Sequence, residues 1–130
     1  MTSPAPLSVL IAEDEVLVSM FLADVVEDAG LRVAGVARTV QDAIAKAEAD
    51  PPDLALLDMN LKGGSGLEVA RALATHGTAV LFISGDPGIE RDPAVQAVRP
   101  AAVLEKPCMP DRLIEALQQV AAELAAVRAP

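Results

Sequence analysis

Carboxylates and a lysine stand where three apolar segments of the chain end. Glu13 and Asp14 follow the first segment, Asp58 ends the second, and Lys106 comes just after the third. If these segments are parallel strands, their carboxyl ends lie at one sheet edge, where open α/β sheets bind ligands. Carboxylates 4 Å apart repel by roughly 1–4 kcal/mol per pair, so the cluster must raise a pKa or bind a cation. The pattern predicts a site for a cation and a phosphoryl group.

The chain between these charged residues alternates two kinds of segment. Apolar runs of strand length are separated by stretches with helical periodicity, which is typical of buried parallel strands that alternate with helices. Right-handed crossovers then leave few topologies other than an α/β fold with a doubly wound, five-stranded parallel sheet and helices on both faces. We expect the strands at residues 7–12, 31–37, 53–58, 79–83 and 101–105.

Five helices are expected to connect and cover the strands. They lie at about 15–29, from Thr39 to before Pro51, from after the loop 62–66 to about His76, at 93–99, and from Pro110 onward. The fourth is expected to be short, because Pro93 and nearby glycines limit it. The apolar face of the first helix is expected to include Leu17, Met20, Phe21, Val25 and Asp28. The last helix carries a core stripe formed by Leu113, Leu117, Val120, Leu124 and Val127.

Length and composition indicate one acidic domain. The chain has 130 residues, a net charge of −9, no Trp or Tyr and two Phe, which argues against a nucleic-acid surface. It shows no signal peptide or membrane-spanning segment, and the single Cys108 suits a reducing compartment, so we expect a cytoplasmic protein. Residues 1–6 are predicted to be a disordered tail, and residues 7–127 the domain.

The charged positions, taken with Ser84 after the fourth strand and Pro107 after Lys106, make the chain resemble the receiver domains of response regulators. The resemblance extends along nearly the whole chain and implies a flavodoxin-like sheet with strand order 2-1-3-4-5. It also implies that Asp58 accepts a phosphoryl group from a histidine kinase or a histidine phosphotransfer protein. Such a protein is not an enzyme, apart from its own phosphoryl acceptance and slow self-dephosphorylation.

An oxygen-lined acidic site suits Mg²⁺. The resemblance implies that the Asp14 and Asp58 side chains and the Asn60 backbone carbonyl bind this ion, with Glu13 acting through a water molecule. Bound metal would keep Asp58 ionised and neutralise charge on the incoming phosphoryl group.

The resemblance also implies which groups contact the phosphoryl group. Lys106 would contact its oxygens, Ser84 would donate its hydroxyl, and Gly85 would leave room for entry. The Lys106–Pro107 peptide bond is expected to be cis.

Two departures from the family pattern concern the switch. Ser84 stands where the family usually has Thr, and Val103 stands where it often has Tyr or Phe. Valine cannot make the aromatic swing that usually accompanies the hydroxyl shift. The run 82–85 resembles the Phe-x-Thr-Gly motif of a receiver subgroup that is often found as single domains, although Asp86 replaces the Tyr that follows there. We therefore expect residues 84–100 to form a mobile switch that phosphorylation orders.

The leading hypothesis is a stand-alone receiver or phosphate shuttle that changes partner binding through its fourth and fifth strands and helices. One alternative is an aspartate-nucleophile phosphohydrolase, but such enzymes carry a general acid two residues after the nucleophile, where this chain has Asn60. Another is a receiver-fold binding module that is not phosphorylated. The sequence leaves open the downstream protein, homodimer formation, and whether the chain is a fragment.

Overall fold

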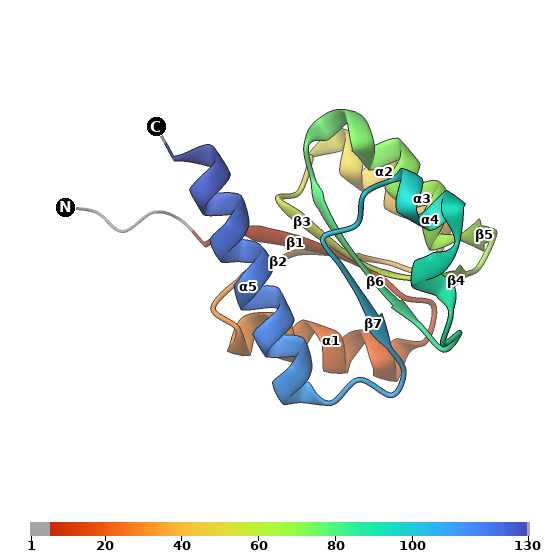
Figure 1. Cartoon of the computed structure of the whole chain (residues 1–130), viewed down its shortest axis with the longest axis horizontal. Coiled ribbons are helices and arrows are strands. Elements are labelled where there is room, and N and C mark those ends of the chain that lie inside the picture. The colour runs from red at the N-terminus through yellow and green to blue at the C-terminus, as the bar shows by residue number, and fades with distance from the viewer. Residues whose placement is uncertain (1–5, 130) are drawn as a thin grey trace.

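The computed structural model describes residues 6–129, and its core is a parallel sheet with the strand order β2-β1-β3-β6-β7 (Figure 1). This order is the predicted 2-1-3-4-5 arrangement. Of the predicted tail, residues 1–5 lie outside the described residues. The strands are β1 (Ser8–Ala12), β2 (Arg32–Ala37), β3 (Leu54–Asp58), β6 (Ala79–Ser84) and β7 (Ala102–Glu105).

Helices cover both faces of the sheet. Figure 1 shows helices on either side of the strands, and they pack into two separate apolar layers. One layer includes α1 (Val16–Asp28) and α5 (Pro110–Arg128), and the other includes α2 (Val40–Ala49), α3 (Gly66–Leu73) and α4 (Pro93–Ala97). Short 3₁₀ turns lie at Ala74–His76 and Ile89–Arg91. No helix within residues 6–129 is long and apolar enough to cross a membrane.

Strand β3 shows why the sequence forms this layered core. Its residues are all buried, and they alternate between the two apolar layers. Leu54 and Leu56 pack with α1 and α5, whereas Ala55 and Leu57 pack with α2 and α3. A central strand that is buried on both faces must be apolar throughout, so only its last residue, Asp58, carries a charge.

The predicted apolar face of α1 is wrong. The helix buries Leu22, Val25 and Val26, whereas Leu17 is 80% exposed and Met20 is 59% exposed. Phe21 and Asp28 are also exposed, so only Val25 of the predicted face lies in the core. The first turns of α1 are apolar on all sides, and periodicity therefore does not fix which side faces the sheet.

The predicted stripe of α5 is only partly correct. Leu113, Leu117 and Val120 are buried, and Leu124 is half-buried. Val127 is 82% exposed, because the last turn of α5 runs past the strands (Figure 1).

A two-stranded antiparallel ribbon follows β3, in a segment where no strand was predicted. It pairs β4 (Asn60–Leu61) with β5 (Gly64–Ser65) and leads directly into α3. Strands of two residues are too short to produce a recognisable alternation of apolar and polar side chains.

Candidate functional site

Three carboxylates meet at the carboxyl edge of the sheet. One oxygen each from Glu13, Asp14 and Asp58 lies within 4.8 Å of the other two. Glu13 and Asp58 are buried, at 2% and 4% exposed, and Asp14 is half-buried. Parallel pairing of β1 with β3 brings these residues together, because Ala12 lies beside Leu57 and the charged residues follow immediately.

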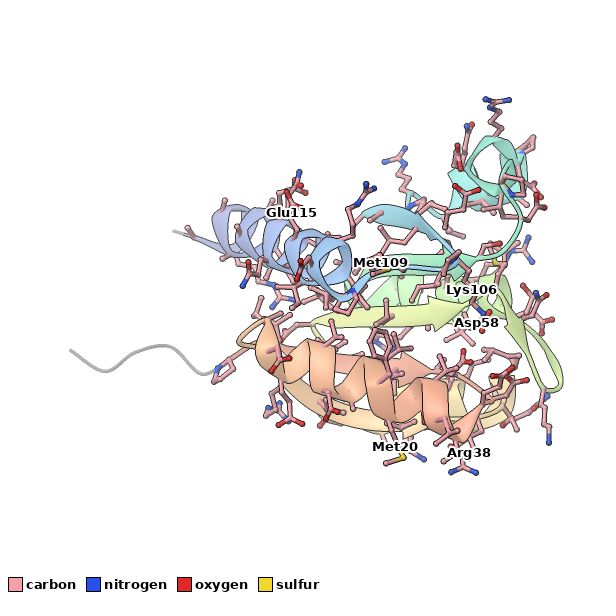
Figure 2. The ribbon with its side chains drawn as sticks, turned by 90° about the horizontal axis from the view of Figure 1, so that it is seen from below. Met20, Arg38, Asp58, Lys106, Met109 and Glu115 are labelled. Atoms are coloured by element: carbon pink, nitrogen blue, oxygen red, sulfur yellow. The ribbon has the colours of Figure 1, made fainter. Side chains whose placement is uncertain are left out.

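Asp58 is held by two donors. The Asn60 backbone N–H donates to Oδ1 at 2.9 Å, and the Lys106 ammonium donates to Oδ2 at 2.7 Å. Figure 2 shows the Asp58 and Lys106 side chains next to each other. Burial alone would raise the pKa of Asp58, but its interactions with Glu13, Lys106 and the Asn60 N–H outweigh it and lower that pKa. Burial would likewise lower the pKa of Lys106, but its contact with Asp58 raises it. Asp58 is therefore ionised at neutral pH.

Glu13 has the opposite state. Burial, a hydrogen bond to Asp58 and the negative charges of Asp58 and Asp14 raise its pKa to about 8. Without a bound cation, Glu13 therefore keeps its proton at neutral pH while Asp58 stays charged. A cation could take over the role of this proton, since both reduce the repulsion among the carboxylates.

Ser84 and Lys106 lie on neighbouring strand ends. Ser84 is buried at the end of β6, and its Oγ accepts a hydrogen bond from the Asp86 N–H at 3.0 Å. The Lys106 N–H donates to the Ser84 carbonyl oxygen at 2.8 Å, which fixes the spacing of the two residues. Gly85 is exposed, and an added Cβ there would meet no atom within 4 Å. The Lys106–Pro107 peptide bond is cis.

Val103 lies apart from these polar groups. It pairs with Phe82 across β6 and β7, is half-buried, and packs against the apolar layer beneath α2 and α3.

The sequence analysis missed Gly66. An added Cβ at Gly66 would overlap the Asp58 carbonyl oxygen, so only glycine fits beside the backbone of Asp58. The Gly66 N–H also donates to the Met59 carbonyl oxygen at 3.0 Å. The glycine-rich run before α3 was the available signal, but sequence alone could not show which glycine meets which backbone atom.

Comparison with known proteins identifies the family. Residues 9–118 match the family described as the response regulator receiver domain. The phyllosphere-induced regulator PhyR of Methylorubrum extorquens is 38% identical over 114 residues, which cover 85% of this chain and 42% of PhyR. The solution structure of the receiver domain of PhyR from Erythrobacter litoralis has 30% identity and a TM-score of 0.80, with 92% of each chain covered.

The fold and the acidic edge therefore define a receiver domain of two-component signalling. The chain belongs to the response regulator receiver family, whose members are generally signalling domains and not enzymes. A methylesterase of Myxococcus xanthus is 37% identical, but the chain spans only 30% of that protein's length. The Chemotaxis protein CheY of Thermotoga maritima is 27% identical, and this chain spans 95% of it.

Proposed function

We propose that the chain is a response regulator that accepts a phosphoryl group on Asp58 from a phosphohistidine and then changes its protein contacts. The donor is a histidine kinase or a histidine phosphotransfer protein. The observation that carries this proposal is a buried Asp58 that one lysine holds beside two further carboxyl groups.

In this reaction an Asp58 carboxylate oxygen attacks the phosphorus atom of the donor phosphohistidine. A P–O bond forms to Asp58 while the P–N bond breaks, and its electron pair leaves with the imidazole nitrogen, which gains a proton. Lys106 is already 2.7 Å from Asp58 and can follow the charge onto the phosphoryl oxygens. The Ser84 hydroxyl currently accepts a hydrogen bond, so its own proton is available for donation to a phosphoryl oxygen.

The donor set at this edge fits a hard divalent cation such as Mg²⁺, since it consists of carboxylate oxygens close together. We assign the Asp14 and Asp58 side chains and the Asn60 carbonyl as ligands, with Glu13 acting through water. When bound, Mg²⁺ would neutralise the carboxylates and the incoming phosphoryl charge. This assignment also provides a charge partner for Glu13 in place of its proton.

An exposed apolar surface beside the site suits a donor protein. Val16, Leu17, Met20 and Phe21 of α1 are exposed, and so is Met109 at the start of α5. Phe21 also lines a cavity of about 460 Å³, whose other walls include Glu13 and Lys106. We propose that the donor docks over α1 and this cavity, because a protein seated there places its histidine next to Asp58.

The response is proposed to involve β6, α4, β7 and α5, with residues 84–100 as the segment that changes. Helix α4 spans only Pro93–Ala97, and the preceding turn is exposed from Gly85 to Gly88. Few buried contacts hold such a segment in one conformation.

The direct test is phosphorylation by a small donor. The protein is incubated with acetyl phosphate and Mg²⁺, and intact mass is measured. We expect one added phosphoryl group in the wild type and none in Asp58→Asn or in excess EDTA. Phosphoryl incorporation that survives Asp58→Asn would refute the assignment of Asp58.

A further inference from the structure

The β4–β5 ribbon connects Asp58 to the start of α2. On the side of the site, the Asn60 N–H donates to Asp58 Oδ1 at 2.9 Å. Asn60 is the first residue of β4 and pairs with Ser65, and Leu61 pairs with Gly64. The first residue of the ribbon therefore bonds directly to the proposed phosphoryl acceptor.

The turn of the ribbon bonds to α2. The Val40 N–H donates to the Lys62 carbonyl oxygen at 3.1 Å, and a parallel bridge joins Thr39 to Lys62. Val40 is the first residue of α2, and Thr39 caps the helix by accepting a hydrogen bond from the Asp42 N–H at 3.0 Å. The first N–H groups of a helix have no partner within the helix, so Lys62 supplies one that α2 would otherwise lack.

The ribbon packs closely against the start of α2. Leu61 and Met59 are buried in the same apolar layer as Val40. The side chain of Gln41, from the first turn of α2, lies over Gly63, where an added Cβ would be only 2.7 Å from its Oε1. Side chains from α2 and backbone bonds from the site therefore hold the same short segment.

Asn60 is sensitive to what occupies the site through both of its backbone polar groups. Phosphorylation converts the Asp58 carboxylate into an acyl phosphate, which reduces the charge on Oδ1, the oxygen that accepts the Asn60 N–H. The Asn60 carbonyl is a proposed metal ligand. A change in the bonding of either Asn60 group therefore acts on β4, and β4 continues through the turn of the ribbon to Lys62.

We propose that the β4–β5 ribbon transmits the phosphorylation state of Asp58 to the first turn of α2, which forms a second region of response beside residues 84–100. This proposal rests on phosphoryl acceptance at Asp58. It does not require a rotating aromatic side chain at position 103, where this chain has valine.

The first experiment compares amide hydrogen exchange by NMR in the free protein and in its complex with Mg²⁺ and beryllofluoride, which stands in for the phosphoryl group. We expect exchange at Asp42 and Ala43 to change by about three- to tenfold in the complex, the effect of altering one hydrogen bond. Chemical shifts of residues 60–65 should change in the same complex. Unchanged exchange at α2 in a formed complex would overturn the proposal.

The second experiment removes the bond between the ribbon and α2. Val40→Pro deletes the N–H donor at the first helical position, where proline is tolerated. Thr39 already has φ −129° and ψ 160°, a conformation compatible with a following proline. Val40→Ala is the matched control, because it shortens the side chain but keeps the N–H. We expect the exchange response of α2 to be lost in Val40→Pro and kept in Val40→Ala, with the same phosphorylation rate in both.

The two experiments separate the link from the proposed function. If the complex forms and α2 does not respond, the link is wrong while phosphoryl acceptance stands. If neither beryllofluoride nor acetyl phosphate modifies the protein, the proposed function fails and the link fails with it. If Val40→Pro does not fold, the wild-type measurement alone decides. An α2 response that persists in a folded Val40→Pro protein would overturn the proposal.

Discussion

Strand β3 has an aspartate at each end, and the two have different surroundings. Asp53, just before the strand, accepts hydrogen bonds from the Ser8 N–H at 2.8 Å and the Ser8 hydroxyl at 3.2 Å, and from Arg128 at 2.6 Å. Asp58, the last residue of the strand, also has a cation and a backbone N–H as donors. However, it shares its environment with the carboxyl groups of Glu13 and Asp14.

The two aspartates differ in the balance of charge around them. Burial would raise the pKa of Asp53, but the bonds from Arg128 and Ser8 outweigh it and lower that pKa. One carboxylate there balances one guanidinium. At the other end, three carboxyl groups face the single ammonium of Lys106, and the surplus negative charge requires a proton or a cation. Both aspartates have good donors, so the number of neighbouring carboxylates is what differs.

The largest expected effect is the loss of phosphorylation in Asp58→Asn. The amide is not a nucleophile, so the added mass after treatment with acetyl phosphate should disappear. Asp53→Asn is the matched control at the other end of the strand and should still be phosphorylated. The prediction is wrong if Asp58→Asn is still phosphorylated, or if a folded Asp53→Asn protein is not.

Lys106→Ala should slow phosphorylation by about 10²-fold, the usual cost of removing one charged group from a phosphoryl-transfer site. Its fold should remain, because the Lys106 side chain is 41% exposed and has little packing role. Arg128→Ala is the matched removal of the other cation. It should leave the rate unchanged and lower the free energy of unfolding by about 1 kcal/mol or less. Stopped-flow phosphorylation and urea denaturation measure the two quantities, and equal rates in both variants would contradict this prediction.

The pH dependence of stability should differ between the two ends. Glu13 has a pKa of about 8 in the folded protein against 4.5 ordinarily, so the folded state binds more protons between these values. The unfolding free energy in EDTA should therefore decrease as pH rises from 4.5 to 8, by about 1–4 kcal/mol. Asp53 and Asp58 have lowered pKa values, so the stability they contribute is lost only as pH falls through those values.

Urea denaturation with and without Mg²⁺ tests this pH dependence. Saturating Mg²⁺ should abolish the decrease, because the cation replaces the proton. Glu13→Gln should abolish it without metal. A decrease of the same size in Glu13→Gln would show that another group is responsible.

The smallest effect in this series is expected for Gly66→Ala. The new Cβ would overlap the Asp58 carbonyl oxygen, so the strand end must shift. We expect a loss of about 1–3 kcal/mol in the free energy of unfolding and slower phosphorylation. Gly88→Ala is the control, since an added Cβ there meets only Asp86 Oδ1 at 4.0 Å. Comparable losses in the two variants would contradict a role of Gly66 in positioning the backbone of Asp58.

The neighbours of Asp58 could be predicted from the sequence, whereas those of Asp53 could not. Asp58 follows an uninterrupted apolar run, and the parallel fold then places it beside Glu13 and Lys106. The cluster of Asp53, Ser8 and Arg128 was not predicted, because no local pattern connects these three residues. Their contact depends on the length of α5 and on the path it takes across the sheet.

The same reasoning explains the errors in α1 and in the segment after Asp58. An apolar pattern identifies a buried face only where polar residues mark the opposite face, as they do near Asp24 and Glu27 but not near Leu17. The β4–β5 ribbon depends on backbone bonds and on close approaches at Gly63 and Gly64, which side-chain type does not encode.

The burial of β3 on both faces determines which parts of the backbone can unfold locally. The strand is hydrogen-bonded to β1 on one side and to β6 on the other, and every one of its side chains is covered. Its amides should exchange with solvent only when the whole domain unfolds, whereas the exposed residues of the ribbon and of the segment before α4 should exchange through local opening. A phosphoryl group on Asp58 would thus be attached to the most slowly exchanging backbone of the molecule, next to its most rapidly opening segments.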